Sequence, residues 1–349
     1  MRKSFKREVS PGSFHEGAER KGAMEKFLYH LEIFLKKQMT RKGFLKVCCA
    51  ALLAFIAGNQ FLKAAFAKSE VSSGRPKKGL KGAHDIVAVK GEDAYKNTVK
   101  AVEAMGGMGC FVKKGAVVVV KPNMAWDRSP RQAANTEPAV VAALVEMCYQ
   151  AGAKRVNVFD IPCNEDRPVY EHTGIAAAAK EKGAFVYFAD HWNVVKAKFA
   201  YNSSMEGWPV LRDAVECDTF INVPVLKHHG YTKLTLSMKN LMGVCSGKRG
   251  LIHLDIGPKL VDMADFINPD LTVIDATRVL VRNGPSGGNE ADVQVFNTVI
   301  AATDPTLADV YACSLVKVDP VDIPYLKAAM ARGFGRSDLS KADILQVQA

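Results

Sequence analysis

The chain has 349 residues, a formal net charge of +11 and an apolar fraction of 48%, which fits a globular protein with one large core or two modest ones. The positive charge lies near the start: residues 1–67 hold 13 Lys and Arg against 5 Asp and Glu, whereas residues 86–349 hold 29 of each. A neutral folded region lacks the basic face with which a nucleic-acid-binding domain neutralises phosphates. We therefore expect no nucleic-acid partner.

Residues 39–67 have the pattern of an export signal: a basic start at 40–46, an apolar run at 47–56 and small residues ending at Ala67. The start is similar to a twin-arginine signal with Lys42 in place of the second arginine, and the general secretory route tolerates the same leader. The apolar run is too short and too interrupted to span a membrane comfortably. We expect cleavage after Ala67, the export machinery as a partner, and a periplasmic or otherwise exported protein without a stable membrane span. An uncleaved amphipathic anchor is the alternative.

Three further segments follow from composition. Residues 1–38 are charged and irregular, and they fit poorly in front of a signal, so we expect them to be disordered or untranslated, with the true start at Met39. Residues 68–85 are rich in Lys, Gly and Ser and predict a flexible linker. Residues 86–349 then form the folded domain.

Apolar runs and helical spacings alternate along the first half of this domain. In chain order we expect a strand at 86–90, a helix at 93–105, a central strand at 116–120, a helix at 137–150, a strand at 156–159, a helix at 168–182 and a strand at 184–188. The glycines at 106–109 follow a helix rather than a strand, which indicates a helix stop and not a phosphate cradle. The alternation predicts a mostly parallel sheet with helices on both faces.

The second half continues the pattern. We expect a strand at 219–223 stopped by Pro224, a polar loop, helices at 235–242 and 258–267, strands at 271–275 and 299–302, and helices at 305–316 and 321–332. The predicted class is α/β, either as one body or as two lobes around one crevice.

The loop after Pro224 carries the strongest functional signal. Lys227, His228, His229, Lys239 and Asn240 follow the strand within sixteen residues. Basic side chains there suit an anionic ligand, and imidazoles add a proton carrier or a metal ligand. We assign anion binding to Lys227 and Asn240, and proton transfer to His229 or Lys239. The alternative is a solvated loop with incidental charges.

Other predicted strands also end in polar residues, namely Lys121 with Asn123, Asp160, and Asp275. The carboxyl ends of parallel strands share one edge, so these groups converge if the strands are parallel. Lys121 and Asn123 would bind a carboxylate or phosphate. Asp160, Asp275 and His228 would hold a divalent metal, or an aspartate would orient a histidine. Each aspartate taken alone is better explained as a turn or helix cap, and it is their coincidence at several strand ends that favours a site.

Two further groups remain open. Arg249 and His253 form a second basic cluster, in which Arg249 would bind substrate and His253 would act as an acid or base or serve structure alone. Cys163 is read as structural, with a nucleophile, a metal ligand or half of a disulfide as alternatives. The six cysteines after residue 67 form no C-x-x-C pair, so we expect no iron–sulfur cluster, and one or two disulfides remain open.

The chain resembles the Domain-of-Unknown-Function 362 family, in particular an exported subgroup with twin-arginine-like leaders. The matching segments lie in order at 119–123, 135–138, 151–156, 222–229, 236–243, 269–275, 283–285 and 303–305. The family pattern L-K-x-H falls on Lys227 and His229. The resemblance implies an α/β fold without an assigned reaction, and the iron–sulfur module of some relatives is missing here. The chain is also loosely similar to lactate racemase-type proteins, as a likeness of fold.

Taken together, the sequence predicts an exported enzyme of unknown reaction class. It would bind a small anionic substrate, use lysine and histidine for acid–base chemistry, and employ a divalent metal as an option. The alternative is a non-catalytic metal-binding or redox-accessory protein of the cell envelope.

Overall fold

The computed structural model describes residues 70–349. The expectations about the extension at 1–38 and the signal at 39–67 lie outside the described residues. Within residues 70–349, no helix combines the length and apolar character needed to cross a membrane.

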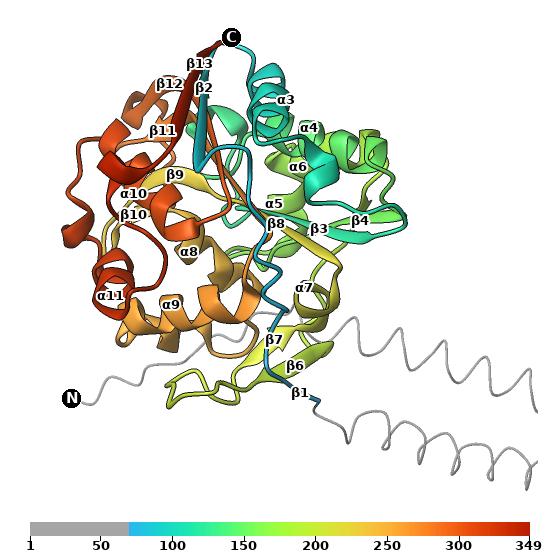
Figure 1. Ribbon diagram of the computed structural model, residues 1–349, viewed down its shortest axis with the longest axis vertical. Helices are drawn as coiled ribbons and strands as arrows, with labels where there is room; N and C mark the ends of the chain where they lie inside the picture. Colours follow the sequence, from blue (N-terminus) through green and yellow to red (C-terminus); the bar gives the residue numbers. More distant parts are fainter. Residues whose placement is uncertain (1–69) are drawn as a thin grey trace, which may run out of the picture. The chain divides into compact units, whose positions relative to one another are not determined.

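A ten-stranded sheet forms the centre of the domain (Figure 1). Its main path runs β13 (Ile344–Gln348), β2 (Ile86–Lys90), β12 (Val293–Ala302), β11 (Leu271–Leu280), β8 (Thr219–Val223), β3 (Val117–Pro122), β4 (Arg155–Val158) and β5 (Phe185–Val186). β12 is antiparallel to both of its neighbours, and the other pairs on this path are parallel. β9 (Val225–His229) adds to β11 in parallel, and β10 (Lys233–Thr235) pairs antiparallel with β9. The mostly parallel sheet is therefore confirmed.

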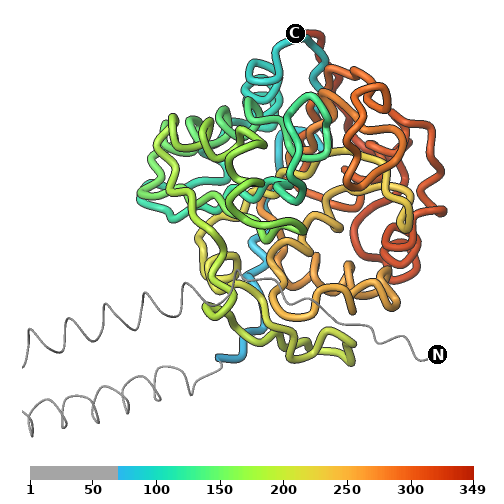
Figure 2. Tube along the Cα trace, turned by 180° about the vertical axis from the view of Figure 1, so that it is seen from behind, coloured from blue at the N-terminus to red at the C-terminus, as the bar shows by residue number. Residues whose placement is uncertain are grey.

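Helices cover both faces of this sheet. One group is α3 (Ala94–Ala104), α4 (Pro138–Gln150), α5 (Asp166–His172) and α6 (Ile175–Glu181); the other is α8 (Ser237–Asn240), α9 (Ile256–Ile267), α10 (Pro305–Leu315) and α11 (Pro324–Arg332). Figure 2 shows the first group, coloured cyan to green, and the second group, coloured yellow to red, in separate halves of the domain. α7 (Arg212–Glu216) follows a small sheet of β1 (Val71–Ser72), β6 (Val194–Ala197) and β7 (Pro209–Leu211). Short 3-10 helices are η2 (Met108–Cys110), η3 (Pro130–Gln132), η4 (Leu241–Val244), η5 (Arg249–His253), η6 (Glu290–Asp292), η7 (Pro320–Asp322) and η8 (Leu339–Lys341).

Strand β3 shows why the sheet is buried on both sides. Val118 and Val120 pack into the core with the first helix group, whereas Val119 between them packs into the core with the second. All three side chains are fully buried. A strand that contributes to two cores reads as an uninterrupted apolar run, which is the pattern that identified it in the sequence.

Three predicted elements differ from the structure. The helix expected at 168–182 is two helices, because the chain turns at Gly174 with a left-handed φ of 72°. The strand expected at 184–188 keeps only the two residues of β5, and the helix expected at 235–242 is the short α8 followed by η4.

The predicted loop after Pro224 is also wrong, because the chain continues as β9. Proline lacks an amide hydrogen, so it cannot donate to a strand ladder. The pairing of β8 with β3 therefore ends before Pro224, while the pairing with β11, which β8 begins at Ile221, continues in β9 with Val225 opposite Asp275. Since β11 extends to Leu280, Asp275 lies inside a strand and not at its end.

The expected linker at 68–85 needs correction for its described part. Arg75 is buried, forms an ion pair with Asp270 and donates to the Cys217 carbonyl oxygen at 2.5 Å. Lys78 adds a second ion pair to Asp270 at 2.9 Å. This segment is thus held on the domain by charge as well as by β1.

The described cysteines are all unpaired: Cys110, Cys148, Cys163, Cys217, Cys245 and Cys313. None of these six cysteines forms the disulfide that the sequence leaves open.

Candidate functional site

A cavity of about 430 Å³ lies where β3, β4 and β9 end. Its size is at the lower end of the range for small-molecule sites. Most of the predicted site residues line it: Lys121, Asn123, Asp160, Cys163, Lys227, His229, Lys239, Asn240, Arg249 and His253. The convergence expected from parallel strands is therefore present, although the segments are far apart in the sequence.

Asp275 and His228 do not reach this cavity. The buried Asp275 carboxylate accepts hydrogen bonds from the Glu137 and Thr277 amides and from the Thr277 hydroxyl, at 2.7–2.9 Å. His228 lines a different cavity, and its Nδ1 accepts from the Gly284 amide at 3.1 Å. Among residues 70–349 no three His, Cys, Asp or Glu side chains gather into a group that could hold a metal ion. Asp160, Asp275 and His228 are thus separate groups, and the geometry does not keep them together as metal ligands.

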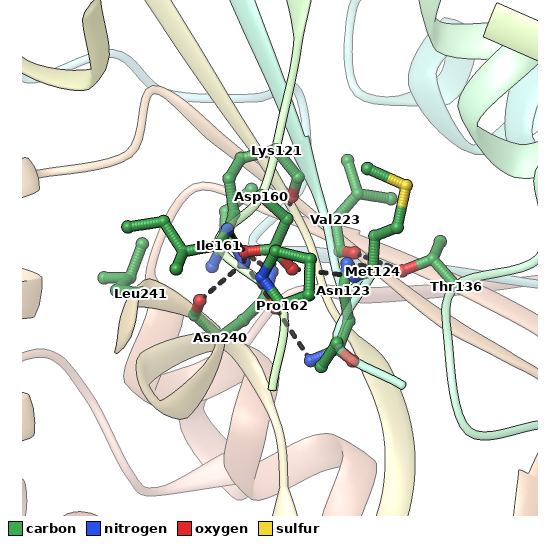
Figure 3. Close-up of polar contacts among 12 residues, drawn as sticks. Lys121, Asn123, Met124, Thr136, Asp160, Ile161, Pro162, Val223, Asn240 and Leu241 are labelled. Carbon is green, nitrogen blue, oxygen red and sulfur yellow. Dashed lines mark hydrogen bonds and ion pairs between the residues drawn. The ribbon is translucent and has the colours of Figure 1, made fainter. Parts of the chain in front are cut away.

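Lys121 and Asp160 form a buried ion pair at the floor of the cavity. The Lys121 Nζ lies 2.9 Å from Asp160 Oδ1, and both side chains are 1% exposed. The same ammonium donates to the backbone oxygen and Oδ1 of Asn240 at 2.7 and 2.9 Å (Figure 3). Three acceptors satisfy the three N–H bonds of a charged lysine. Burial lowers the pKa of Lys121, and Asp160 opposes that effect.

The Asp160 carboxylate is equally satisfied. Besides Lys121, it accepts from the Met124 amide at 2.7 Å and the Ile161 amide at 2.9 Å (Figure 3). Gly243 makes this packing possible, because a Cβ there would lie 1.8 Å from Asp160 Oδ1. The pair therefore shapes the floor, because all three Lys121 N–H bonds and three of about four carboxylate acceptor sites are occupied by the protein.

Two asparagines connect this pair to Lys227. Asn240 donates through Nδ2 to the Asn222 side-chain oxygen at 2.9 Å, which leaves its Oδ1 as the acceptor for Asn123 Nδ2 at 3.0 Å. Asn123 then presents its own Oδ1 to the Lys227 Nζ at 3.1 Å. Each amide orientation is fixed by the next group, so the network holds Lys227 in one place.

Lys227 is a buried lysine without an anionic partner. Its Nζ donates to Asn123 Oδ1 and to the Ala134 carbonyl oxygen at 2.5 Å, and no carboxylate of residues 70–349 lies within 4.0 Å. Burial lowers its pKa to about 7, and the charge of Lys239 adds to this effect.

Lys239 is a second lysine of this cavity that lacks a carboxylate partner among the described residues. The only partner of its Nζ among the described residues is the Met242 sulfur at 3.7 Å, which is a weak acceptor. Burial lowers its pKa to about 8. Thr235 lines the same cavity and is 3% exposed, and its hydroxyl has no hydrogen-bond partner among the described residues. An unsatisfied buried hydroxyl and an unpaired ammonium in the wall of one cavity are what a missing ligand would leave.

His229 is held in one tautomer. Its Nδ1 accepts from the Tyr231 amide at 3.1 Å and from the Thr232 amide at 3.2 Å, so the ring proton sits on Nε2. Burial, together with the charges of Lys239 and Lys227, lowers the pKa of His229 to about 3. This geometry makes His229 a neutral hydrogen-bond donor through Nε2, so it lacks the free acceptor nitrogen that the base role expected from the sequence requires.

The remaining wall is η5, which carries Arg249 and His253. Arg249 donates to the Ile161 and Pro162 carbonyl oxygens at 2.8 and 2.6 Å, leaving other guanidinium N–H bonds free. The His253 ring stacks at 6.3 Å from that of His229. Burial lowers the pKa of His253, and Lys239 adds to the shift.

Sequence reasoning missed several lining residues: Ala125, Trp126, Ile161, Thr235, Met242, Gly243, Gly250 and Pro285. Most of them contribute backbone or apolar surface, for which no residue-type signal exists. Thr235 is the exception by chemistry, but a threonine in an alternating segment reads as an ordinary strand residue.

One comparison with known proteins identifies a family, and the others give similar proteins. A family model described as "Domain of unknown function (DUF362)" matches residues 118–314. A thylakoid-associated protein of Synechocystis is 30% identical over 241 residues, which is 65% of this chain and 71% of that protein. Among solved structures, the lactate racemase apoprotein from Thermoanaerobacterium thermosaccharolyticum is 12% identical with a TM-score of 0.45, over 69% of this chain and 58% of that one. A Thermotoga maritima protein is 13% identical with a TM-score of 0.35, over 66% and 60%.

Proposed function

Because the chain belongs to the DUF362 family, whose description names no activity, we propose a function from the cavity itself. The protein is an enzyme that binds a small substrate carrying a carboxylate or phosphate and transfers a proton with the lysine and histidine side chains around it.

The observation that carries this proposal is an uncompensated positive charge in a buried cavity. Four basic side chains line it, Lys121, Lys227, Lys239 and Arg249, against one carboxylate, Asp160. Asp160 is already paired with Lys121. Burying an unpaired ammonium costs several kcal/mol, so the arrangement is strained unless an anion enters. An anionic substrate supplies the missing charge.

The position of each group supports a division of roles. Lys239, Arg249 and the unpaired Thr235 hydroxyl are donors that can hold an anion. Lys227, with its pKa lowered to about 7 by burial, can take up or release a proton near neutral pH. His229 donates from Nε2 and would stabilise negative charge that develops on the substrate.

Anion binding is tested by thermal unfolding and calorimetric titration with phosphate, sulfate and small mono- and dicarboxylates. Lys239→Met removes a donor to the anion, and Lys248→Met is the matched control, because Lys248 is exposed and does not line the cavity. Losing a charge-assisted hydrogen bond, worth about 1.5–3 kcal/mol, weakens binding about 10- to 100-fold. No stabilisation by any of these anions, or equal binding by the two variants, contradicts the proposal.

We also keep the proposal that the protein is exported and cleaved after Ala67. The Synechocystis relative is named for a thylakoid association, which is a statement about that protein. N-terminal sequencing of the protein from fractionated native cells tests the proposal: a mature start near Lys68 in an exported fraction supports it, and an intact leader in the cytoplasmic fraction contradicts it.

A further inference from the structure

Two lysines are buried in this site, and their hydrogen-bonding partners differ in number. Lys121 Nζ has three oxygen acceptors, one of them a carboxylate. Lys227 Nζ has two, the Asn123 side-chain oxygen and the Ala134 carbonyl oxygen. An ammonium has three N–H bonds to satisfy, whereas a neutral amine has two and one lone pair.

The partners of Lys227 therefore match a neutral amine, and those of Lys121 match an ammonium. The surroundings agree, since Lys227 is 1% exposed and lacks a carboxylate within 4.0 Å among the described residues. Burial and the charge of Lys239 both lower the pKa of Lys227, to about 7. A desolvated amine next to another cation is the arrangement that activates lysine as a nucleophile toward carbonyl compounds.

Building on the anion-binding function above, we propose that the Lys227 amine condenses with the carbonyl carbon of a small oxo acid and forms an imine. Nζ attacks the carbonyl carbon, and the carbonyl oxygen takes up a proton to give a carbinolamine. Nζ loses one proton to leave the neutral carbinolamine, the hydroxyl leaves as water after protonation, and the resulting C=N–H⁺ iminium loses its remaining N–H proton to give the imine. The step consumes no oxidant or reductant, and it is reversible by water.

The cavity provides the other parts that this substrate class requires. A carboxylate next to the carbonyl would be held by Lys239 and Arg249, which line the same cavity as Lys227. The Nε2–H of His229 is available for the carbonyl oxygen, because Nδ1 is occupied by two backbone amides. The ammonium of Lys239, which lines the same cavity, is the acid that we assign to the departing water. An aldehyde without a carboxylate would lose the anion contact.

The test traps the imine in the full chain. The protein is incubated at pH 7.5 with glyoxylate or pyruvate and cyanoborohydride, and the labelled residue is located by peptide mass spectrometry. At this pH the free-amine fraction of Lys227, with its pKa of about 7, exceeds that of an exposed lysine about 500-fold. We expect one adduct per chain at Lys227, and none at Lys121, which serves as an internal control.

Three comparisons decide the result. Acetaldehyde should label Lys227 at least about 10-fold more slowly than glyoxylate, because one charge-assisted contact is missing. Lys227→Arg should abolish the site-specific adduct, and Lys239→Met should slow it while leaving the protein folded. Peptide mapping of the unaltered protein decides the matter even if the Lys227 variant does not fold.

Labelling confined to exposed lysines overturns the imine proposal, and equal labelling by acetaldehyde overturns the oxo-acid assignment. These failures are distinct from failure of the proposed function. If phosphate or carboxylates stabilise the protein through Lys239 but Lys227 stays unlabelled, anion binding stands and the imine does not. If no anion binds, the function itself is contradicted.

Discussion

Asp160→Asn removes the negative charge from the floor of the cavity and keeps the shape of the side chain, so it tests the contribution of that charge to stability. The wild-type carboxylate receives Lys121 Nζ and the Met124 and Ile161 amides. An asparagine keeps one acceptor oxygen and turns an NH₂ group toward a donor. Lys121 then becomes a buried cation without a counter-charge.

The expected cost follows from the burial of both partners, each 1% exposed. Removing one member of a buried ion pair destabilises a protein by about 3–5 kcal/mol. For a domain of this size, each kcal/mol lowers the melting temperature by about 2–4 °C, so we expect a drop of roughly 6–20 °C. Urea unfolding followed by circular dichroism measures the free energy directly.

Two controls separate charge burial from general disturbance. Glu290→Gln breaks the exposed Arg131–Glu290 pair and should cost no more than about 1 kcal/mol. Combining Lys121→Met with Asp160→Asn removes both charges. The loss of unfolding free energy in the double variant should therefore be smaller than the sum of the two single losses by at least about 1–2 kcal/mol. A loss below about 1 kcal/mol for Asp160→Asn, or strict additivity in the double variant, would refute the reasoning.

Three further predictions concern the same domain. Gly243→Ala places a Cβ against Asp160 Oδ1 and should lower the unfolding free energy by several kcal/mol, whereas Gly250→Ala meets nothing within 4 Å and should leave it nearly unchanged; equal urea midpoints would contradict this. Because burial lowers the pKa of His229 to about 3, the unfolded chain binds the extra proton first, so stability should fall as pH drops from about 6.5 toward 3, by up to about 1.4 kcal/mol per unit from this group. His229→Asn should show a shallower acid slope, and identical slopes would sink the assignment. Arg75→Met should cost about 3–5 kcal/mol through its buried ion pair, against less than about 1 for Lys77→Met at an exposed pair; similar losses in urea unfolding would argue against a docked segment.

The core of the site could be predicted because a polar residue directly after an apolar run marks the end of a buried strand. Lys121 and Asp160 each follow an apolar run, and parallel strands bring such ends to one edge. The ion pair between them, 39 positions apart in the chain, follows from that rule. The identity of their partners does not, since the Asn240 oxygens reach Lys121 through the short α8, whose length the sequence overestimated.

The errors share a cause around Pro224. The sequence predicts residues 225–229 as a loop, and a loop does not determine which way the side chains of Lys227, His228 and His229 point. In a strand, side chains alternate, so Lys227 and His229 face the cationic cavity and His228 faces away. Likewise, Asp275 looked like a strand end only because the apolar run stops there, while the backbone ladder continues to Leu280. When a strand's hydrogen-bonded backbone continues beyond its apolar run, the residue types do not indicate where the strand ends.

The docked segment around Arg75 sets a practical boundary for preparing shortened forms of this protein. A chain beginning at residue 86 would lack both cations that pair with Asp270. The buried Asp270 carboxylate would then keep only the hydrogen bond from the Phe220 backbone amide among the described residues. Such a truncation should express poorly or aggregate, whereas one beginning at residue 70 retains the segment. The first residues of the described domain thus belong to its folding unit, although their composition is that of a tether.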